Sequence, residues 1–359
     1  MVETFQTKLS DSKLWRWAAL ILLASAMFFA YIFVDILSPL QEFLQTQRGW
    51  DPVAYGHYAG SEPFLNVFVF FLIFAGIILD KMGVRFTAVL SGMVMVVGAG
   101  INYYAVSDFF VESSMETFFT NTLNLPQTWW NVTPFYAGMP ASAKLSAIGF
   151  MIFGCGAEMA GITVSRGIVK WFKGKEMALA MGIEMAIARV GVAVVVVASP
   201  ALAAIKPISV SRPVAFELVL LCIGLICFIV YGFMDKKLDA QGVEEEKDDP
   251  FKVSDISKIL SLKVFWLVAL LCVLYYYSAI FPFQKYAINM LQCNLHFSAA
   301  DAGLVFFVFP LGAAAVTPVL GNYLDHKGKG ASMLILGAIL MIVCHLVFAF
   351  VVPATQSVV

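Results

Sequence analysis

GFMIFGCGAEMAGITVSRGIVKWFKGKEMALAMGIEMAIARVGVA, the stretch from Gly149 to Ala193, decides the fold. It predicts parts of two long apolar helices, over about 144–168 and 177–203, joined by a short basic turn. At about 1.5 Å of rise per residue, Glu158 lies about 15 Å and Arg189 about 20 Å from that turn. Because the hydrocarbon core of a bilayer is about 30 Å thick, both charges are predicted near its middle.

A charge at that depth costs roughly 3 kcal/mol, so each of these side chains is expected to face a partner or a watery cavity. Two interpretations follow. Glu158 and Arg189 are either substrate-binding groups or a structural ion pair that locks the two helices together.

The composition predicts an all-α polytopic membrane protein whose surroundings are the lipid bilayer. The 359 residues are 60% hydrophobic and 13% charged, and their mean hydropathy is +0.85. The net charge of −1 gives no indication of a nucleic-acid partner. The six cysteines show no CxxC spacing and are expected to be apolar packing residues rather than disulfides.

Nine spans are predicted, and the distribution of Lys and Arg puts the N-terminus in the cytoplasm. Residues 1–233 are predicted to form a six-span N-terminal bundle, 234–262 a charged cytoplasmic linker, and 263–359 a partial C-terminal bundle. The predicted spans lie at about 15–44, 52–80, 85–105, 144–168, 177–203, 213–233, 263–291, 298–320 and 331–353.

A short sequence pattern is repeated at the predicted cytoplasmic ends of two spans. GIILDKMGVR runs from Gly76 to Arg85, and GNYLDHKGKG runs from Gly321 to Gly330. The glycines are expected to permit close helix approach and a tight reversal, and the aspartate with its basic neighbours to form a latch. Parallel repeats of this kind are typical of transporters with the site at the repeat interface. The predicted cytoplasmic gate residues are Gly76, Asp80, Gly83, Arg85, Gly321, Asp325 and Gly328.

At these residues the chain resembles the major facilitator superfamily, and within it the branch of lysosomal dipeptide uniporters and their bacterial relatives. VKWFKGKE, residues 169–176, is the most specific matching segment. The others include YIFVDILSPLQ (31–41), MAIARVG (185–191), YYSAIFPF (276–283) and CHLVFAF (344–350). The resemblance implies a twelve-span fold with alternating access, so the chain is expected to be truncated after its ninth span.

The resemblance also implies that Glu158 faces the amine and Arg189 the carboxylate of a zwitterionic dipeptide. The planar fork of an arginine suits a carboxylate in any case. Asp35 lies four residues after Tyr31 on one helix face, where it either lines the cavity or bonds a neighbouring helix. Tyr276 is the fourth predicted substrate-binding residue, chosen from three consecutive tyrosines by helical geometry.

The predicted function is a secondary-active or facilitative transporter that moves a small peptide or amino-acid-like zwitterion by a rocker-switch cycle. One alternative is a proton-coupled organic-anion transporter in which Arg189 and Lys285 both bind carboxylate. Another is a non-transporting membrane sensor or scaffold. No enzyme motif, catalytic residue, metal site or cofactor is expected. The protein is expected to be a monomer in a bacterial inner membrane.

Overall fold

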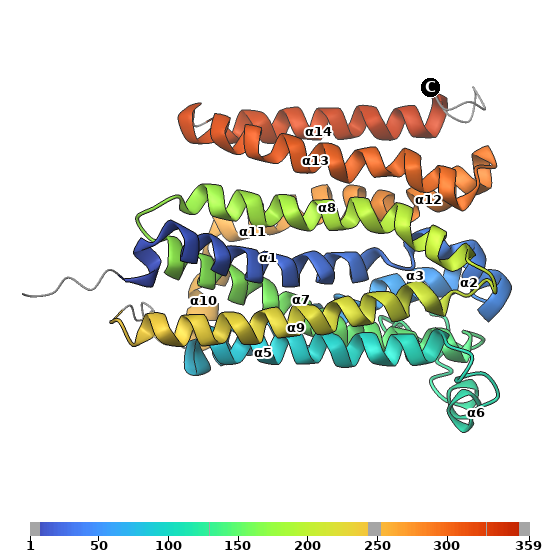
Figure 1. Ribbon diagram of the computed structural model, residues 1–359. Coiled ribbons are helices and arrows are strands. Elements are labelled where there is room, and N and C mark those ends of the chain that lie inside the picture. Colours follow the sequence, from blue (N-terminus) through green and yellow to red (C-terminus); the bar gives the residue numbers. More distant parts are fainter. Residues whose placement is uncertain (1–7, 129, 243–252, 328, 352–359) are drawn as a thin grey trace, which may run out of the picture.

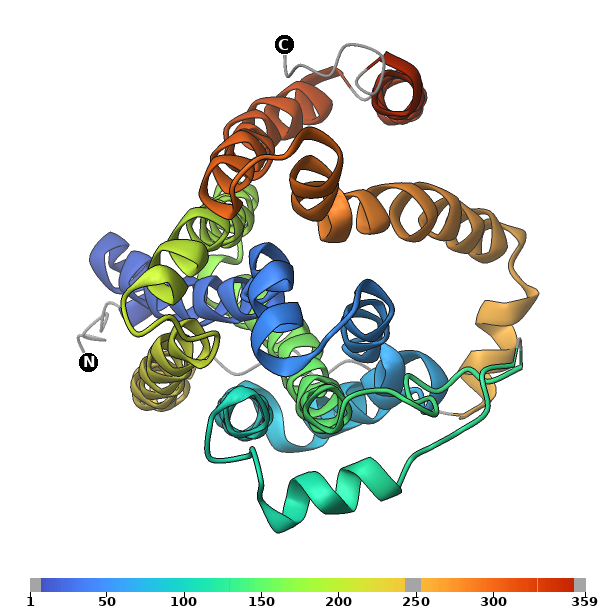
Figure 2. The ribbon, with the colours of Figure 1, turned by 90° about the vertical axis from the view of Figure 1, so that its right-hand side faces the viewer.

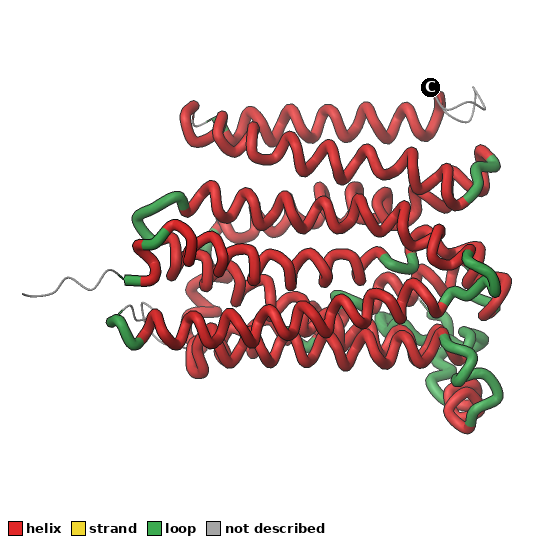
Figure 3. Tube along the Cα trace, viewed as in Figure 1, coloured by secondary structure: helices red, strands yellow, loops and turns green. Residues whose placement is uncertain are grey.

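The computed structural model describes residues 8–128, 130–242, 253–327 and 329–351 (Figure 1). Its described part is built from helices and loops, as Figure 3 shows. The α-helices are α1 (Lys13–Asp35), α2 (Gln41–Arg48), α3 (Pro52–Ser61), α4 (Phe64–Phe68), α5 (Phe71–Val106), α6 (Ser114–Asn121), α7 (Ala141–Phe172), α8 (Met177–Ala204), α9 (Ser211–Asp239), α10 (Val253–Ser261), α11 (Lys263–Cys272), α12 (Phe281–Leu295), α13 (Ala299–Lys327) and α14 (Gly330–Leu346).

Eight helical segments in the described residues are long and apolar enough to cross a membrane. The prediction had nine spans, and the difference lies in its second span, residues 52–80. There the chain is divided into α3, α4 and the first part of α5, because Pro63 follows the end of α3 and Phe70 has a positive φ of 56°. A residue outside right-handed helical geometry ends the regular hydrogen bonding of a helix.

Gly83 interrupts α5 with φ 77° and ψ 170°, a conformation that is essentially restricted to glycine. The residues of the predicted second and third spans therefore meet at Gly83, where the sequence predicts a tight reversal.

The helices α1, α5, α7, α8 and α9 pack together as one group, with α1 at its centre (Figures 1 and 2). α1 contacts α7, α8 and α9 and carries eleven buried residues. We use the term inner end for the end of this group where α1 begins and α7 ends, and outer end for the opposite one.

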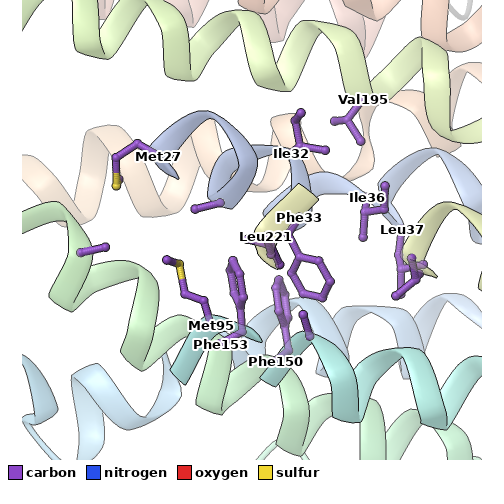
Figure 4. Packing of buried hydrophobic residues seen from close by; sticks show 14 of the residues in the cluster. Met27, Ile32, Phe33, Ile36, Leu37, Met95, Phe150, Phe153, Val195 and Leu221 are labelled. Atoms are coloured by element: carbon purple, nitrogen blue, oxygen red, sulfur yellow. The ribbon is translucent and has the colours of Figure 1, made fainter. Parts of the chain in front are cut away.

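The centre of this group is packed by aromatic side chains from α1 and α7 (Figure 4). The rings of Phe33 and Phe153 are 4.5 Å apart, and Phe150 stacks on Tyr58 of α3 at 4.6 Å. Gly149 allows the close approach of α5, since a Cβ there would lie 2.7 Å from the Gly98 carbonyl oxygen. In a membrane, such van der Waals packing is the main source of helix association.

The described helices of the C-terminal part meet the first group through α12 and α13. α13 lies beside α8 (Figure 1), and a Cβ at Gly303 would lie 2.2 Å from the carbonyl oxygen of Val196. α12 buries Gln284 and Lys285 at the outer end, whereas α11 and α14 carry no fully buried residue.

Candidate functional site

Glu158 and Arg189 lie in the middle of α7 and α8. Glu158 is exposed and Arg189 is half-buried. Among the described residues neither side chain forms a hydrogen bond or an ion pair, with the other or with a third group. The structure therefore does not contain the locking ion pair that was one interpretation of the sequence.

Two tyrosines from other helices lie near both charges. Tyr31 on α1 and Tyr276 in the π-helical segment Val273–Ile280 each interact electrostatically with Arg189 and with Glu158. Tyr276 is 39% exposed and Tyr31 is partly buried. The four side chains come from four different elements, and the helices after residue 252 contribute one of them, Tyr276.

Asp35 lies at the outer end of α1, where it forms an ion pair with Lys285 of α12. The Lys285 Nζ lies 2.6 Å from Asp35 Oδ1, and the two side chains are 4% and 3% exposed. Gln284 donates a second hydrogen bond to Asp35 at 3.2 Å, and Lys285 also donates to the Val34 carbonyl at 3.0 Å. Of the two expectations for Asp35, the structure shows the bond to a neighbouring helix.

Glu62 follows the end of α3 and contacts α7. Its backbone carbonyl and side chain contact α7 at Gly154, one helical turn before Glu158. It interacts electrostatically with Glu158, Lys285 and Asp35. Glu62 is therefore within electrostatic range of the outer ion pair and of Glu158.

The first copy of the predicted gate motif makes ion pairs at the inner end. Asp80 accepts from Arg166 of α7, and Arg85 Nη1 lies 2.6 Å from Asp239 Oδ2 of α9. Gly83 makes the predicted reversal. Gly76 differs from the expectation, because no described atom of another helix lies within 4 Å of its Cβ position and no close helix approach occurs there.

The second copy of the motif lies at the end of α13. Gly321 and Asp325 fall within that helix, and Gly328 lies outside the described residues. Whether the two copies act together as a gate stays a prediction.

The sequence interpretation missed a buried ionic cluster beside the first motif. Lys170 Nζ lies 2.7 Å from Asp235 Oδ2 and 2.6 Å from Asp239 Oδ1, and the Trp171 indole donates to Asp235 Oδ1 at 3.0 Å. The sequence feature that could have indicated this cluster is the VKWFKGKE segment, which contains Lys170 and Trp171. Asp235 and Asp239 are four residues apart and so lie on one face of α9.

Two further charges of VKWFKGKE, Lys175 and Glu176, bind residues at and just before the start of α1. Glu176 accepts a hydrogen bond from Arg16 Nη2 at 3.0 Å, and Lys175 Nζ lies 2.8 Å from Asp11 Oδ1. Hydrogen bonds from the backbone of Glu176 and from Arg16 lower the pKa of the Glu176 carboxyl.

The fold defines a multi-pass integral membrane protein, and among its described residues an acid and an arginine in the middle of two apolar helices, Glu158 and Arg189, form no hydrogen bond or ion pair. The chain matches the Major Facilitator Superfamily over residues 23–359 and belongs to that family. Its members are transporters, and the described residues contain no group of three His, Cys, Asp or Glu suited to a metal ion.

The chain is also similar to proteins named lysosomal dipeptide transporter MFSD1. It is 28% identical to the Danio rerio protein over 220 residues, which cover 57% of this chain and 46% of that protein. It is 27% identical over 218 residues to the proteins of Gallus gallus and Homo sapiens, covering 57% of this chain and 48% and 46% of theirs. The chain spans about half the length of these curated relatives.

Proposed function

We propose that this major facilitator transporter carries a small zwitterion of the dipeptide or amino-acid class, with Glu158 binding its amine and Arg189 its carboxylate. The observation that supports this best is that Glu158 and Arg189, two opposite charges without a hydrogen bond or ion pair among the described residues, both interact electrostatically with Tyr31 and Tyr276. A zwitterion presents one charge of each sign, so it satisfies both side chains at once. The similarity to named dipeptide transporters agrees with this substrate class.

Tyr31 and Tyr276 complete the proposed site. Each interacts electrostatically with both charges, and Tyr276 belongs to the helices after residue 252. A substrate held between Tyr276 and the charges of α7 and α8 therefore contacts both groups. In alternating access the two helix groups move relative to each other around a fixed substrate site, so the substrate is expected to contact both groups.

The organic-anion alternative is less well supported, because its second cation is already paired. Lys285 is bound to Asp35 at 2.6 Å and its side chain is 4% exposed, whereas Arg189 forms no ion pair among the described residues. In this proposal the N-terminus is cytoplasmic, and the protein is a monomer in a bacterial cell membrane.

Uptake into proteoliposomes tests the proposal. The wild-type protein is expected to accumulate a labelled dipeptide inside the vesicles. Unlabelled dipeptides should compete with this uptake, whereas dicarboxylates should not. Glu158→Gln and Arg189→Ala are each expected to abolish the uptake. Ser165→Ala is the matched control on α7, since its exposed hydroxyl bonds only the Gly161 carbonyl in its own helix. Full uptake by both charge variants would contradict the site. Displacement by dicarboxylates alone would favour the anion carrier, and binding without any uptake would favour the sensor.

A further inference from the structure

A short helix outside the membrane spans, α6, lies at the outer end of the first helix group. The chain enters it after α5 ends at Val106 and leaves it before α7 begins at Ala141. Its axis is roughly perpendicular to those spans, and it lies at the edge of the group rather than over its centre (Figures 1 and 2). Because the spans cross the bilayer, α6 runs along the membrane plane near the level where the spans end.

α6 has one apolar face. Met115, Phe118 and Phe119 are three and four residues apart and share that face, whereas Thr117 and Thr120 lie on the opposite one. Phe119 is buried in a small cluster with apolar residues of α5 and α7. Met115 and Phe118, however, are 40% and 55% exposed. The described part of the protein therefore covers only part of the apolar face of α6.

Polar contacts hold α6 in this position. Lys144 Nζ on α7 donates to the carbonyl oxygens of Phe119 and Thr122 at 2.9 and 2.8 Å. It also donates to Asn124 Oδ1 at 2.7 Å, and Lys144 is buried. The Ser113 side chain caps the other end of α6 by accepting a backbone hydrogen bond. The fold thus fixes where the exposed apolar side chains of α6 lie.

An open apolar groove of about 550 Å³ lies between α5, α6 and α7. Its lining includes Val97 and Ile101 of α5, Ile148 of α7 and Met115 of α6. Val97 is exposed, and so is Met93 one turn earlier on the same face of α5. An exposed apolar face of a membrane span contacts lipid tails, which are as apolar as leucine. The groove is therefore continuous with the lipid-facing surface of α5.

We propose that this groove binds an acyl chain of a phospholipid from the leaflet at the outer end, with the apolar face of α6 lying at the headgroup boundary of that leaflet. An amphipathic helix in the membrane plane buries its apolar face about 5–10 Å into this boundary. Residues 107–140 contain no Lys or Arg, so the contact is apolar and does not depend on anionic headgroups. The inference is independent of the substrate proposed above.

Spin labels on α6 test its position. In protein whose six native cysteines are replaced, a nitroxide is attached through Phe118→Cys or, as the matched control, through Thr120→Cys. The exposed Thr120 hydroxyl donates to the Glu116 carbonyl of its own helix. In phosphatidylcholine vesicles, collisions with oxygen and with a water-soluble nickel chelate should place the label at position 118 about 5–10 Å inside the headgroup boundary and the label at position 120 in water.

Two results of this measurement would overturn the proposal. One is a label at position 118 that is as accessible to the nickel chelate as the label at position 120, because α6 would then lie in water. The other is a label at position 118 that is protected from both reagents. A protein partner or a second copy of this chain would then cover the apolar face in place of lipid.

Filling the groove tests the acyl-chain site. Gly100 lines the groove, and no described atom of another helix lies within 4 Å of its Cβ position, so Gly100→Leu should fold and occupy the groove. Val97→Trp should fill it from a second, exposed position. Gly232→Leu, at a helical glycine of α9 with the same free space, is the matched control.

Native mass spectrometry measures the lipid that stays bound after the protein is reconstituted with phosphatidylcholine and released from micelles. Both groove variants are expected to retain one phosphatidylcholine fewer than the wild type and Gly232→Leu. Thermal melting reports whether each variant is folded. Retention at the wild-type level by a folded groove variant, or an equal loss in Gly232→Leu, would overturn the acyl-chain site.

Discussion

Lys170 Nζ on α7 lies 2.7 Å from Asp235 Oδ2 on α9, and the two side chains are 4% and 0% exposed. The same ammonium group reaches Asp239, which in turn binds Arg85 of the gate motif. This chain of charges ties α5, α7 and α9 together at the inner end. VKWFKGKE, the segment most specific to the family resemblance, therefore contributes to the ion-pair network at the inner end.

Removing Lys170 is expected to destabilise the fold strongly. Lys170→Met leaves the buried Asp235 carboxylate without its cation and should lower the free energy of unfolding by roughly 3–5 kcal/mol. Equilibrium unfolding in mixed micelles, followed by tryptophan fluorescence, measures this change. Lys236→Met, an exposed lysine on the same stretch of α9, is the matched control and should stay within about 0.5 kcal/mol of the wild type. Equal stability of the two variants would rule out the buried pair as a stabilising contact.

Replacing each of the two glycines of the first gate motif by alanine is expected to have different effects on the free energy of unfolding. Gly83→Ala places a side chain at φ 77° and ψ 170° and should cost about 1–3 kcal/mol of stability. Gly76→Ala adds a methyl group to a helical position with no described atom of another helix within 4 Å, and should be neutral or stabilise by up to about 1 kcal/mol. The same unfolding measurement separates them, and a Gly83→Ala protein as stable as Gly76→Ala would show that the reversal does not need glycine.

The Glu176–Arg16 contact predicts a pH-dependent contribution to stability. The pKa of Glu176 in the folded protein is lowered from its ordinary value of 4.5. Its contribution is therefore present above about pH 4.5 and is lost as the pH falls through the folded pKa. Glu176→Gln does not titrate, so the wild type should melt at a higher temperature than this variant at pH 7, and the gap should close towards pH 3. A gap that is unchanged or widens on acidification would disprove the contact.

The helical fold and the family were predictable because both depend on local signals. Long apolar runs give the spans, and the motif around Gly83 gives the reversal between two of them. The division of the second predicted span was harder to foresee. Pro63 is visible in the sequence, but the positive φ of Phe70 depends on tertiary packing.

The partners of the polar residues were not predictable in the same way. Hydropathy gives the depth of Asp35 in the membrane but not which helix faces it, and its partner Lys285 lies 250 residues away. The same limit applies to Lys170 and Asp235, which are 65 residues apart. Glu158 and Arg189 could be chosen as candidates from their predicted depth alone, because a charge at mid-membrane depth is rare whatever surrounds it, and their role stays a prediction.

Binding of blocked dipeptides tests the central claim most directly. The wild-type protein should bind an unmodified dipeptide more tightly than its N-acetyl or C-amide form, by about 10- to 100-fold each, because each modification removes one charge-assisted hydrogen-bonding group. Arg189→Ala should lose discrimination only against the C-amide, and Glu158→Gln only against the N-acetyl form, in titrations by calorimetry. Discrimination that persists unchanged in both variants, or that is lost for the opposite ends, would contradict the assignment of the amine to Glu158 and the carboxylate to Arg189.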